Sequence, residues 1–158
     1  MIPEEAKQFV ERIAPPVVRH VEKSAIKRYA EAVGNDNPLY YDEEYAGKTK
    51  YGSIIAPPGF WGWPIKAPCS CTGQVYIVGE LQAALARGGF PRILGGGISY
   101  DFFVPVQSGD ILIASPKVTG LSEKEGKGGT MIICNLETTY TNQNGDLVAK
   151  ALQTFIAR

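Results

Sequence analysis

Four segments of the C-terminal part of the chain are rich in β-branched and aromatic residues, namely residues 98–106, 111–118, 130–141 and 147–157. Clusters of turn-forming residues separate them, at 108–110, 125–129 and 142–146. In residues 130–141, apolar and polar positions alternate, which predicts a strand with one buried face. Strands joined by such short turns predict an antiparallel meander.

The N-terminal half has helical periodicity instead. Apolar residues share one face of a predicted short helix over residues 4–13, and a short β-branched run follows at 17–21. Beyond it, an apolar stripe predicts an amphipathic helix that Ser24 caps and Gly34 ends. Asp42 is predicted to cap another short helix, over residues 43–46.

The middle of the chain combines prolines, aromatic residues and glycines. Residues 51–55 are predicted to be extended, and Pro57-Pro58 then precede the segment 60–63, which we expect to be a short buried helix. Residues 81–87 have a helical pattern, but seven glycines between residues 73 and 97 favour a surface excursion of the kind that forms lids. Helices followed by an antiparallel sheet predict one α+β domain over residues 1–158, with the sheet around the aromatic helix.

Composition and charge narrow the classes of function. The 158 residues are 44% hydrophobic, and 16 basic side chains balance 16 acidic ones. A chain without net charge is a poor partner for nucleic acid or an anionic membrane. The acidic N-terminus lacks the apolar region of a secretory signal, and no apolar run reaches the ~18 residues of a membrane span. We therefore expect a cytoplasmic protein without nucleic-acid or membrane partners.

Few side chains are suited to nucleophilic or metal chemistry. His20 is the only histidine, so a Ser-His or Cys-His pair would have to use it, and we expect it to be structural or at the surface. Cys69, Cys71 and Cys134 have the spacing of neither a disulfide framework nor a zinc site. We expect no metal and no cofactor.

The turn that follows the amphipathic helix carries the most specific motif. Residues 29–40, which end in Gly-Asn-Asp-Asn-Pro-Leu-Tyr, resemble the hydratase signature of the MaoC-like acyl-thioester hydratases. Three further matches follow in order, at residues 55–60, 102–110 and 144–149. Together they cover about residues 17–158, and the likeness is closest to the dehydratase-like N-terminal branch, whose central helix is entered through Ala-Pro-Pro.

The resemblance implies a hot-dog fold, in which a sheet wraps around one helix. It also implies hydration of trans-2-enoyl thioesters, or dehydration of (R)-3-hydroxyacyl thioesters, by an Asp and a His that act on one water. Amides at the start of the central helix, here near Pro58 and Gly59, would hold the thioester oxygen.

Both reacting groups of that family are replaced in this sequence. Asn35 stands in the position of the catalytic Asp, and Tyr40 in that of the catalytic His. An amide is no base, and a tyrosine with a pKa of ~10 is a poor proton shuttle at neutral pH. Asp36 lies one position out of register and is a candidate for a displaced base.

The binding half of the site is retained. Asn37, Pro58 and Gly59 match the motif, and the aromatic residues Phe60, Trp61, Trp63 and Tyr76 are candidates to line an acyl tunnel. Alternatively, the aromatic residues are ordinary core, and residues 35–37 serve only to form and cap a turn.

Three functions remain open. The first is the acyl-binding, non-catalytic subunit of a heteromeric (R)-specific enoyl-CoA hydratase or hydroxyacyl dehydratase, completed by a hot-dog partner with an intact Asp/His pair. The second is a homodimeric hydratase that uses Asp36 or Tyr40. The third is a module that binds an acyl-CoA or acyl-carrier-protein thioester without turnover. Because exposed sheet edges are usually covered, each predicts a dimer or a larger even assembly.

Overall fold

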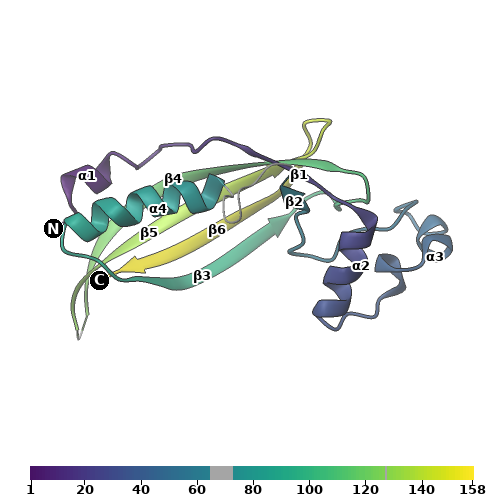
Figure 1. Ribbon diagram of the computed structural model, residues 1–158, viewed down its shortest axis with the longest axis horizontal. Helices are drawn as coiled ribbons and strands as arrows, with labels where there is room; N and C mark the ends of the chain where they lie inside the picture. The colour runs from purple at the N-terminus through teal and green to yellow at the C-terminus, as the bar shows by residue number, and fades with distance from the viewer. Residues whose placement is uncertain (65–72, 127) are drawn as a thin grey trace.

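The computed structural model of the protein describes residues 1–64, 73–126 and 128–158, with the backbone alone at 63–64 and 73–76. Figure 1 shows a long sheet with one helix along it and smaller helices beyond one end. The helical elements are α1 (Glu4–Lys7), α2 (Lys23–Ala32), the 3-10 helix η1 (Pro38–Tyr40), α3 (Glu43–Gly47) and α4 (Gly73–Arg87). The strands are β1 (Val17–His20), β2 (Trp63–Pro64), β3 (Ile93–Phe102), β4 (Ile111–Gly126), β5 (Gly129–Thr141) and β6 (Leu147–Ala157).

The six strands form one sheet in the order β2-β1-β4-β5-β6-β3, and every neighbouring pair is antiparallel. The meander β4-β5-β6 confirms the expected hairpin turns at 125–129 and 142–146. The hairpin expected at 108–110 is wrong, because β3 and β4 do not pair with each other and lie apart in the sheet. Strand β3 then lies outside β6 at one edge, with Ile93 opposite Ala157 and Phe102 opposite Ala149. The strand expected at 98–106 is therefore displaced toward the N-terminus, because pairing with β6 ends at Phe102.

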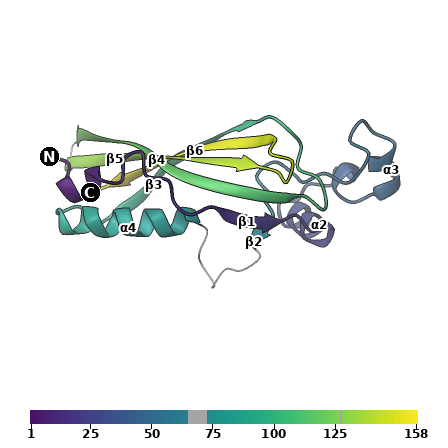
Figure 2. The same cartoon turned by 90° about the horizontal axis from the view of Figure 1, so that it is seen from above.

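Helix α4 covers one face of the sheet, as the two views show (Figures 1 and 2). Its buried residues Ile77, Leu81 and Leu85 belong to one apolar cluster with Val118 and Leu136 of the sheet. The expected helix at 81–87 is thus the second half of a longer helix. The expected surface excursion over residues 73–97 is wrong, because packing on the sheet stabilises a helix and then a strand despite the glycines.

The buried helix expected at 60–63 is also wrong. Gly59 and Gly62 have φ values of 92° and 71°, which no right-handed helix contains. At Gly62, moreover, a Cβ atom would lie 2.5 Å from the carbonyl oxygen of His20, so that strand β1 and this segment approach closely. Phe60 and Trp61 are buried as expected, but they lie in a turn, and α4 is the helix that the sheet packs around.

The small N-terminal helices differ in detail from their expected bounds. Helix α1 stops at Lys7, and Glu11 has a φ of 66° within the range expected to be helical. Helix α2 begins at Lys23 with no side-chain cap, and the Ser24 hydroxyl instead accepts a hydrogen bond from Arg28. Asp42 does cap α3, since its carboxylate accepts from the amides of Glu44 and Tyr45 at 2.9 and 3.0 Å.

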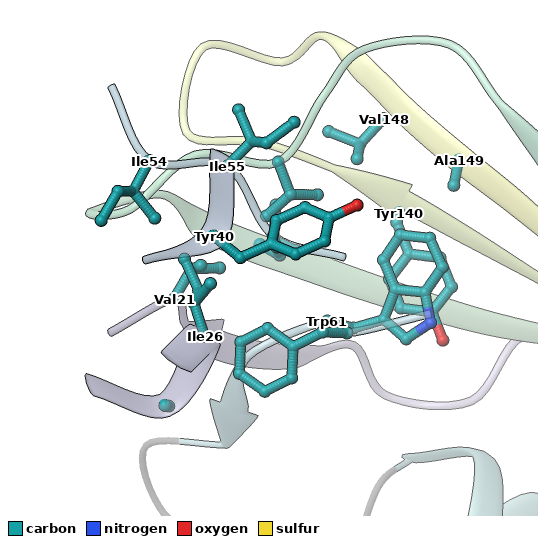
Figure 3. Packing of buried hydrophobic residues seen from close by; sticks show 14 of the residues in the cluster. Val21, Ile26, Tyr40, Ile54, Ile55, Trp61, Tyr140, Val148 and Ala149 are labelled. Carbon is teal, nitrogen blue, oxygen red and sulfur yellow. The ribbon is translucent and has the colours of Figure 1, made fainter. Parts of the chain in front are cut away.

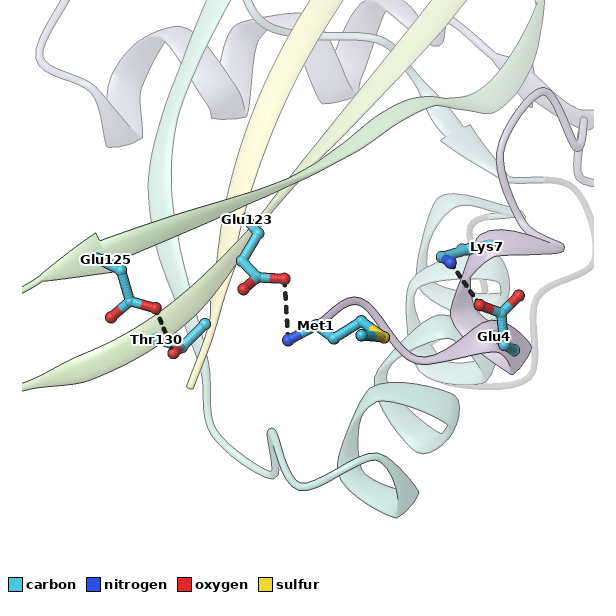
Figure 4. A network of polar contacts seen from close by, with 6 residues as sticks. All are labelled: Met1, Glu4, Lys7, Glu123, Glu125 and Thr130. Atoms are coloured by element: carbon cyan, nitrogen blue, oxygen red, sulfur yellow. Dashed lines mark hydrogen bonds and ion pairs between the residues drawn. The ribbon is translucent and has the colours of Figure 1, made fainter.

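Polar contacts attach the N-terminus to the sheet (Figure 4). The N-terminal amino group lies 2.9 Å from the Glu123 carboxylate of β4, and Lys7 pairs with Glu4. At the tip of the β4-β5 hairpin, the Thr130 hydroxyl donates to Glu125 at 2.6 Å. Residues 51–55 were expected to be extended, but a turn at Tyr51 and a bend at Ser53 interrupt them. Within this segment only Ile55 pairs, with Gln107, in an isolated bridge.

Candidate functional site

A cavity of about 320 Å³ lies beyond the part of the sheet that α4 covers. Three stretches of chain line it, namely Leu39 and Tyr40 with Tyr51, the turn at residues 55–61, and residues 102–106 after strand β3. The isolated bridge between Ile55 and Gln107, and the bond from the Ala56 amide to the Val106 carbonyl at 2.7 Å, join the second stretch to the third. The cavity is therefore built by segments that are about 50 residues apart in the sequence.

Aromatic rings form one wall of this cavity. The Trp61 ring stacks on Tyr140 of β5, with centroids 4.4 Å apart and planes inclined by 16°. It also stacks on Phe102 at 5.8 Å and contacts Tyr100 at 5.7 Å. Figure 3 shows Trp61 over Tyr140 within the apolar cluster. Trp61 is 8% exposed but Phe102 is 52% exposed, so the wall runs from the core to the open edge of the sheet.

The polar side-chain atoms of the cavity come from phenols and an indole. Among the described residues that line it, only Tyr40, Tyr51 and Trp61 carry such atoms, and none carries a carboxylate, an imidazole or an amine. Burial, and secondarily the nearby Tyr51, raises the pKa of Tyr40 above its ordinary value of 10.0. Burial also raises the pKa of Tyr140, behind Trp61, to about 12. The lining phenol of Tyr40 is therefore neutral at physiological pH.

The turn residues of the motif lie outside this cavity. The Asn35 side-chain oxygen accepts from the Asn37 amide at 3.2 Å, and the Asn37 side-chain oxygen accepts from the Leu39 amide at 3.0 Å. Asp36 and Asn37 are exposed. Tyr40, at the end of η1, is 7% exposed and lines the cavity. The structure thus separates the two positions of the family's reacting pair: Asn35 caps the turn, and only Tyr40 reaches the site.

Pro58, Gly59 and Phe60 all line the cavity, as expected. They do so from a turn, so the helix N-terminus expected there does not exist. The Phe60 amide donates within the turn to the Pro57 carbonyl at 3.0 Å. The Gly59 amide makes no hydrogen bond to the described residues, and Gly59 lies beside the Tyr29 hydroxyl, 3.3 Å from where its Cβ would be. The Gly59 amide therefore remains available to a ligand oxygen.

Several expected residues are placed elsewhere. The side chains of Trp63 and Tyr76 lie outside the described residues, as do Cys69 and Cys71. His20 is exposed on β1. Cys134 is buried in the α4 cluster, where burial raises the pKa of its thiol to about 11. Within the described residues, no group of His, Cys, Asp or Glu is arranged to hold a metal.

Two parts of the cavity were not expected from the sequence. Tyr51 gave no signal of its own, because the sequence indicated only that residues 51–55 were extended. Residues 102–106 belong to a quoted motif, but their place opposite the turn at 55–61 depends on the Ile55–Gln107 bridge, which local sequence does not reveal.

A comparison with protein families identifies the chain. A model described as FAS1-like, dehydratase domain region matches residues 9–151. The chain belongs to this family. The resemblance to MaoC-like dehydratases and the α+β hot-dog fold are thereby confirmed.

Curated proteins from bacteria are similar in sequence to most of this chain. A UPF0336 protein of Streptomyces griseus is 28% identical over 153 residues, which span 96% of this chain and 94% of that one. A probable enoyl-CoA hydratase alpha subunit of Thermomonospora curvata is 29% identical over 130 residues, 78% of this chain but only 40% of that longer protein.

Solved structures share the fold. The ChsH1-ChsH2 complex of Mycobacterium tuberculosis contains a chain that superposes with a TM-score of 0.83 at 17% identity, over 97% of this chain and 93% of that one. In the described part of this dehydratase-family chain, no helix is long and apolar enough to cross a membrane.

Proposed function

We propose that this chain is the acyl-thioester-binding subunit of a heteromeric (R)-specific enoyl-CoA hydratase or 3-hydroxyacyl dehydratase, and that a second hot-dog subunit supplies the acid/base pair. One observation carries the proposal: the described lining of the cavity is largely apolar, as an acyl chain requires, but it has no side chain that titrates near neutral pH. Binding and proton transfer would therefore reside in different chains.

The chemistry explains why phenols do not suffice. Hydration of an enoyl thioester requires a base that takes a proton from water as its oxygen bonds to C3, and an acid that delivers a proton to C2. Tyr40 holds its proton too firmly at neutral pH to act as the base, because burial has raised its pKa. Asp36, the other candidate, is exposed and does not line the cavity, so nothing favours the homodimeric enzyme.

The relatives support a divided enzyme. The Thermomonospora curvata protein is named as one subunit of a hydratase, and the Mycobacterium tuberculosis structure is a complex of two differently named chains.

The open edge of the sheet, formed by strand β3, supplies a place for such a partner. Strand β3 is ten residues long, it has a neighbour on one side only, and Leu94, Ile98 and Phe102 on it are 42–52% exposed. Long apolar edges of this kind are usually covered by pairing.

The proposal is tested by hydration of crotonyl-CoA, followed spectrophotometrically. The pure chain should turn over the substrate ~10²-fold to 10⁴-fold more slowly than the mixture with a hot-dog subunit that carries the Asp/His pair, since that is the usual contribution of general acid/base groups. Asp36→Asn and Tyr40→Phe are measured beside it. Fast turnover by the pure chain that collapses in either variant would establish the homodimeric enzyme instead. Binding without turnover in any mixture would leave only an acyl-binding module.

A further inference from the structure

Tyr40 and Tyr51 bring two phenol groups to the same cavity from different segments. Tyr40 ends η1, and Tyr51 lies in the turns that follow α3. Both tyrosines line this cavity, and Tyr51 is also near enough to raise the pKa of Tyr40. In Figure 3 the Tyr40 ring points its hydroxyl away from Val21 and Ile26, toward the side where Val148 and Tyr140 lie.

Neither hydroxyl has a partner among the described residues. Tyr40 is only 7% exposed, yet its hydroxyl makes no hydrogen bond to any described atom. The hydroxyl of Tyr51 makes none either. A tyrosine pairs an apolar ring with a polar hydroxyl that can donate a hydrogen bond. Two hydroxyl donors without a protein partner, on residues that line one cavity, are therefore available to an acceptor on a ligand.

The backbone holds both tyrosines in place. The Tyr40 amide donates to the Asn37 carbonyl at 3.0 Å, in the turn that Asn35 and Asn37 cap. The Tyr51 amide donates to the Thr49 hydroxyl at 3.3 Å, and its carbonyl accepts from the Gln107 side chain at 2.9 Å. The backbone of each tyrosine is thus fixed before a ligand binds, which lowers the entropic cost of binding.

We propose that Tyr40 and Tyr51 form a clasp of two hydroxyl donors that binds one acceptor oxygen of the acyl thioester inside the cavity. The remaining described lining is apolar apart from Trp61 and the backbone, so this oxygen would be the main point of polar recognition. The clasp rests on the proposed function and adds that the site selects for an oxygen as well as for size. Two oxygens qualify by chemistry: the thioester carbonyl, and a hydroxyl on the acyl chain.

Binding of matched ligands to the full chain tests the clasp by calorimetry. Butanoyl-CoA is compared with S-butyl-CoA, a thioether that lacks the carbonyl, and (R)-3-hydroxybutanoyl-CoA is compared with butanoyl-CoA. In one of the two pairs, the protein should prefer the ligand with the additional oxygen. Tyr40→Phe and Tyr51→Phe should each reduce that preference about tenfold, the upper range for one hydrogen bond. The pair that responds identifies which oxygen is bound.

Tyr45→Phe is the matched control, because Tyr45 lies on α3, is 48% exposed and does not line the cavity. It should leave both preferences unchanged. Thermal unfolding of each variant verifies that the fold is kept. If the ligands bind and neither substitution alters a preference, the clasp is wrong and the proposed function stands. If none of the ligands binds to the unmodified protein, both are wrong.

Discussion

At the scale of single residues, Trp61 contributes most visibly to packing. Its ring lies against Tyr140 on the inner side and Phe102 toward the open edge, so that it joins the core of the sheet to the cavity wall. Removal of a buried aromatic ring loses its burial and leaves a void. The same residue therefore serves stability and the shape of the site.

Trp61→Ala should lower the free energy of unfolding by about 3–5 kcal/mol. Denaturant titration followed by circular dichroism measures it. The control Tyr45→Ala, on the surface of α3, should change stability by about 0.5 kcal/mol or less. A loss at Trp61 no larger than in this control would contradict the packing described here.

Cys134 predicts a pH dependence. Burial raises its thiol pKa from 9.0 to about 11, so the folded state disfavours the thiolate more than the unfolded chain does. Because the pKa is raised in the folded state, the contribution of this thiol to the free energy of unfolding is fully present below pH 9. It is lost as the pH rises toward 11. Between pH 8 and 10.5, the free energy of unfolding should fall by about 1–2 kcal/mol more in the unmodified protein than in Cys134→Ala. Denaturant unfolding at both pH values measures it. Equal losses in the two proteins would show that this thiol is not desolvated.

The motif turn shows which residue roles could be predicted from sequence. Turn and cap roles were expected for residues 35–37 and 42, and the hydrogen bonds of Asn35, Asn37 and Asp42 agree, because such bonds span only two or three residues. The family resemblance placed Tyr40 at the site, but its meeting with Tyr51 in one cavity could not be predicted. That meeting depends on the direction in which the chain leaves η1 and returns after α3.

At the scale of elements, β3 is the long edge of the sheet and β2, with two residues, is the short one. A positive charge on an edge strand prevents further pairing. We predict that the pure chain sediments as a dimer or larger even assembly at micromolar concentration, and that Ile98→Lys shifts it toward the monomer. The control Val33→Lys, at the end of α2, places the same charge on a site that is 55% exposed but far from any edge. If the unmodified protein sediments as a single monomeric species, pairing through the β3 edge is refuted.

At the scale of the whole molecule, the cavity should couple ligand binding to stability. A ligand that binds only the folded state stabilises it by about 2.7 kcal/mol at ~100 times its Kd. For a chain of this size, that corresponds to a rise of roughly 5–10 °C in Tm. Butanoyl-CoA should produce such a rise in a thermal scan, and coenzyme A without an acyl group should produce a smaller one, because it leaves the cavity unfilled. Equal shifts would place binding outside the cavity.

The sequence by itself determined the meander β4-β5-β6, the turns between its strands, the α+β class and the family motif, because these depend on short-range periodicity and turn chemistry. Tertiary structure alone decided which segment became the central helix. Residues 60–63 are aromatic and follow two prolines, but the left-handed conformations of Gly59 and Gly62 and the close approach of His20 prevent a helix, and Trp63 begins β2 instead. Residues 73–87 form α4 despite Gly73 and Gly79, since burial of Ile77, Leu81 and Leu85 against the sheet outweighs the helix propensity that glycine removes.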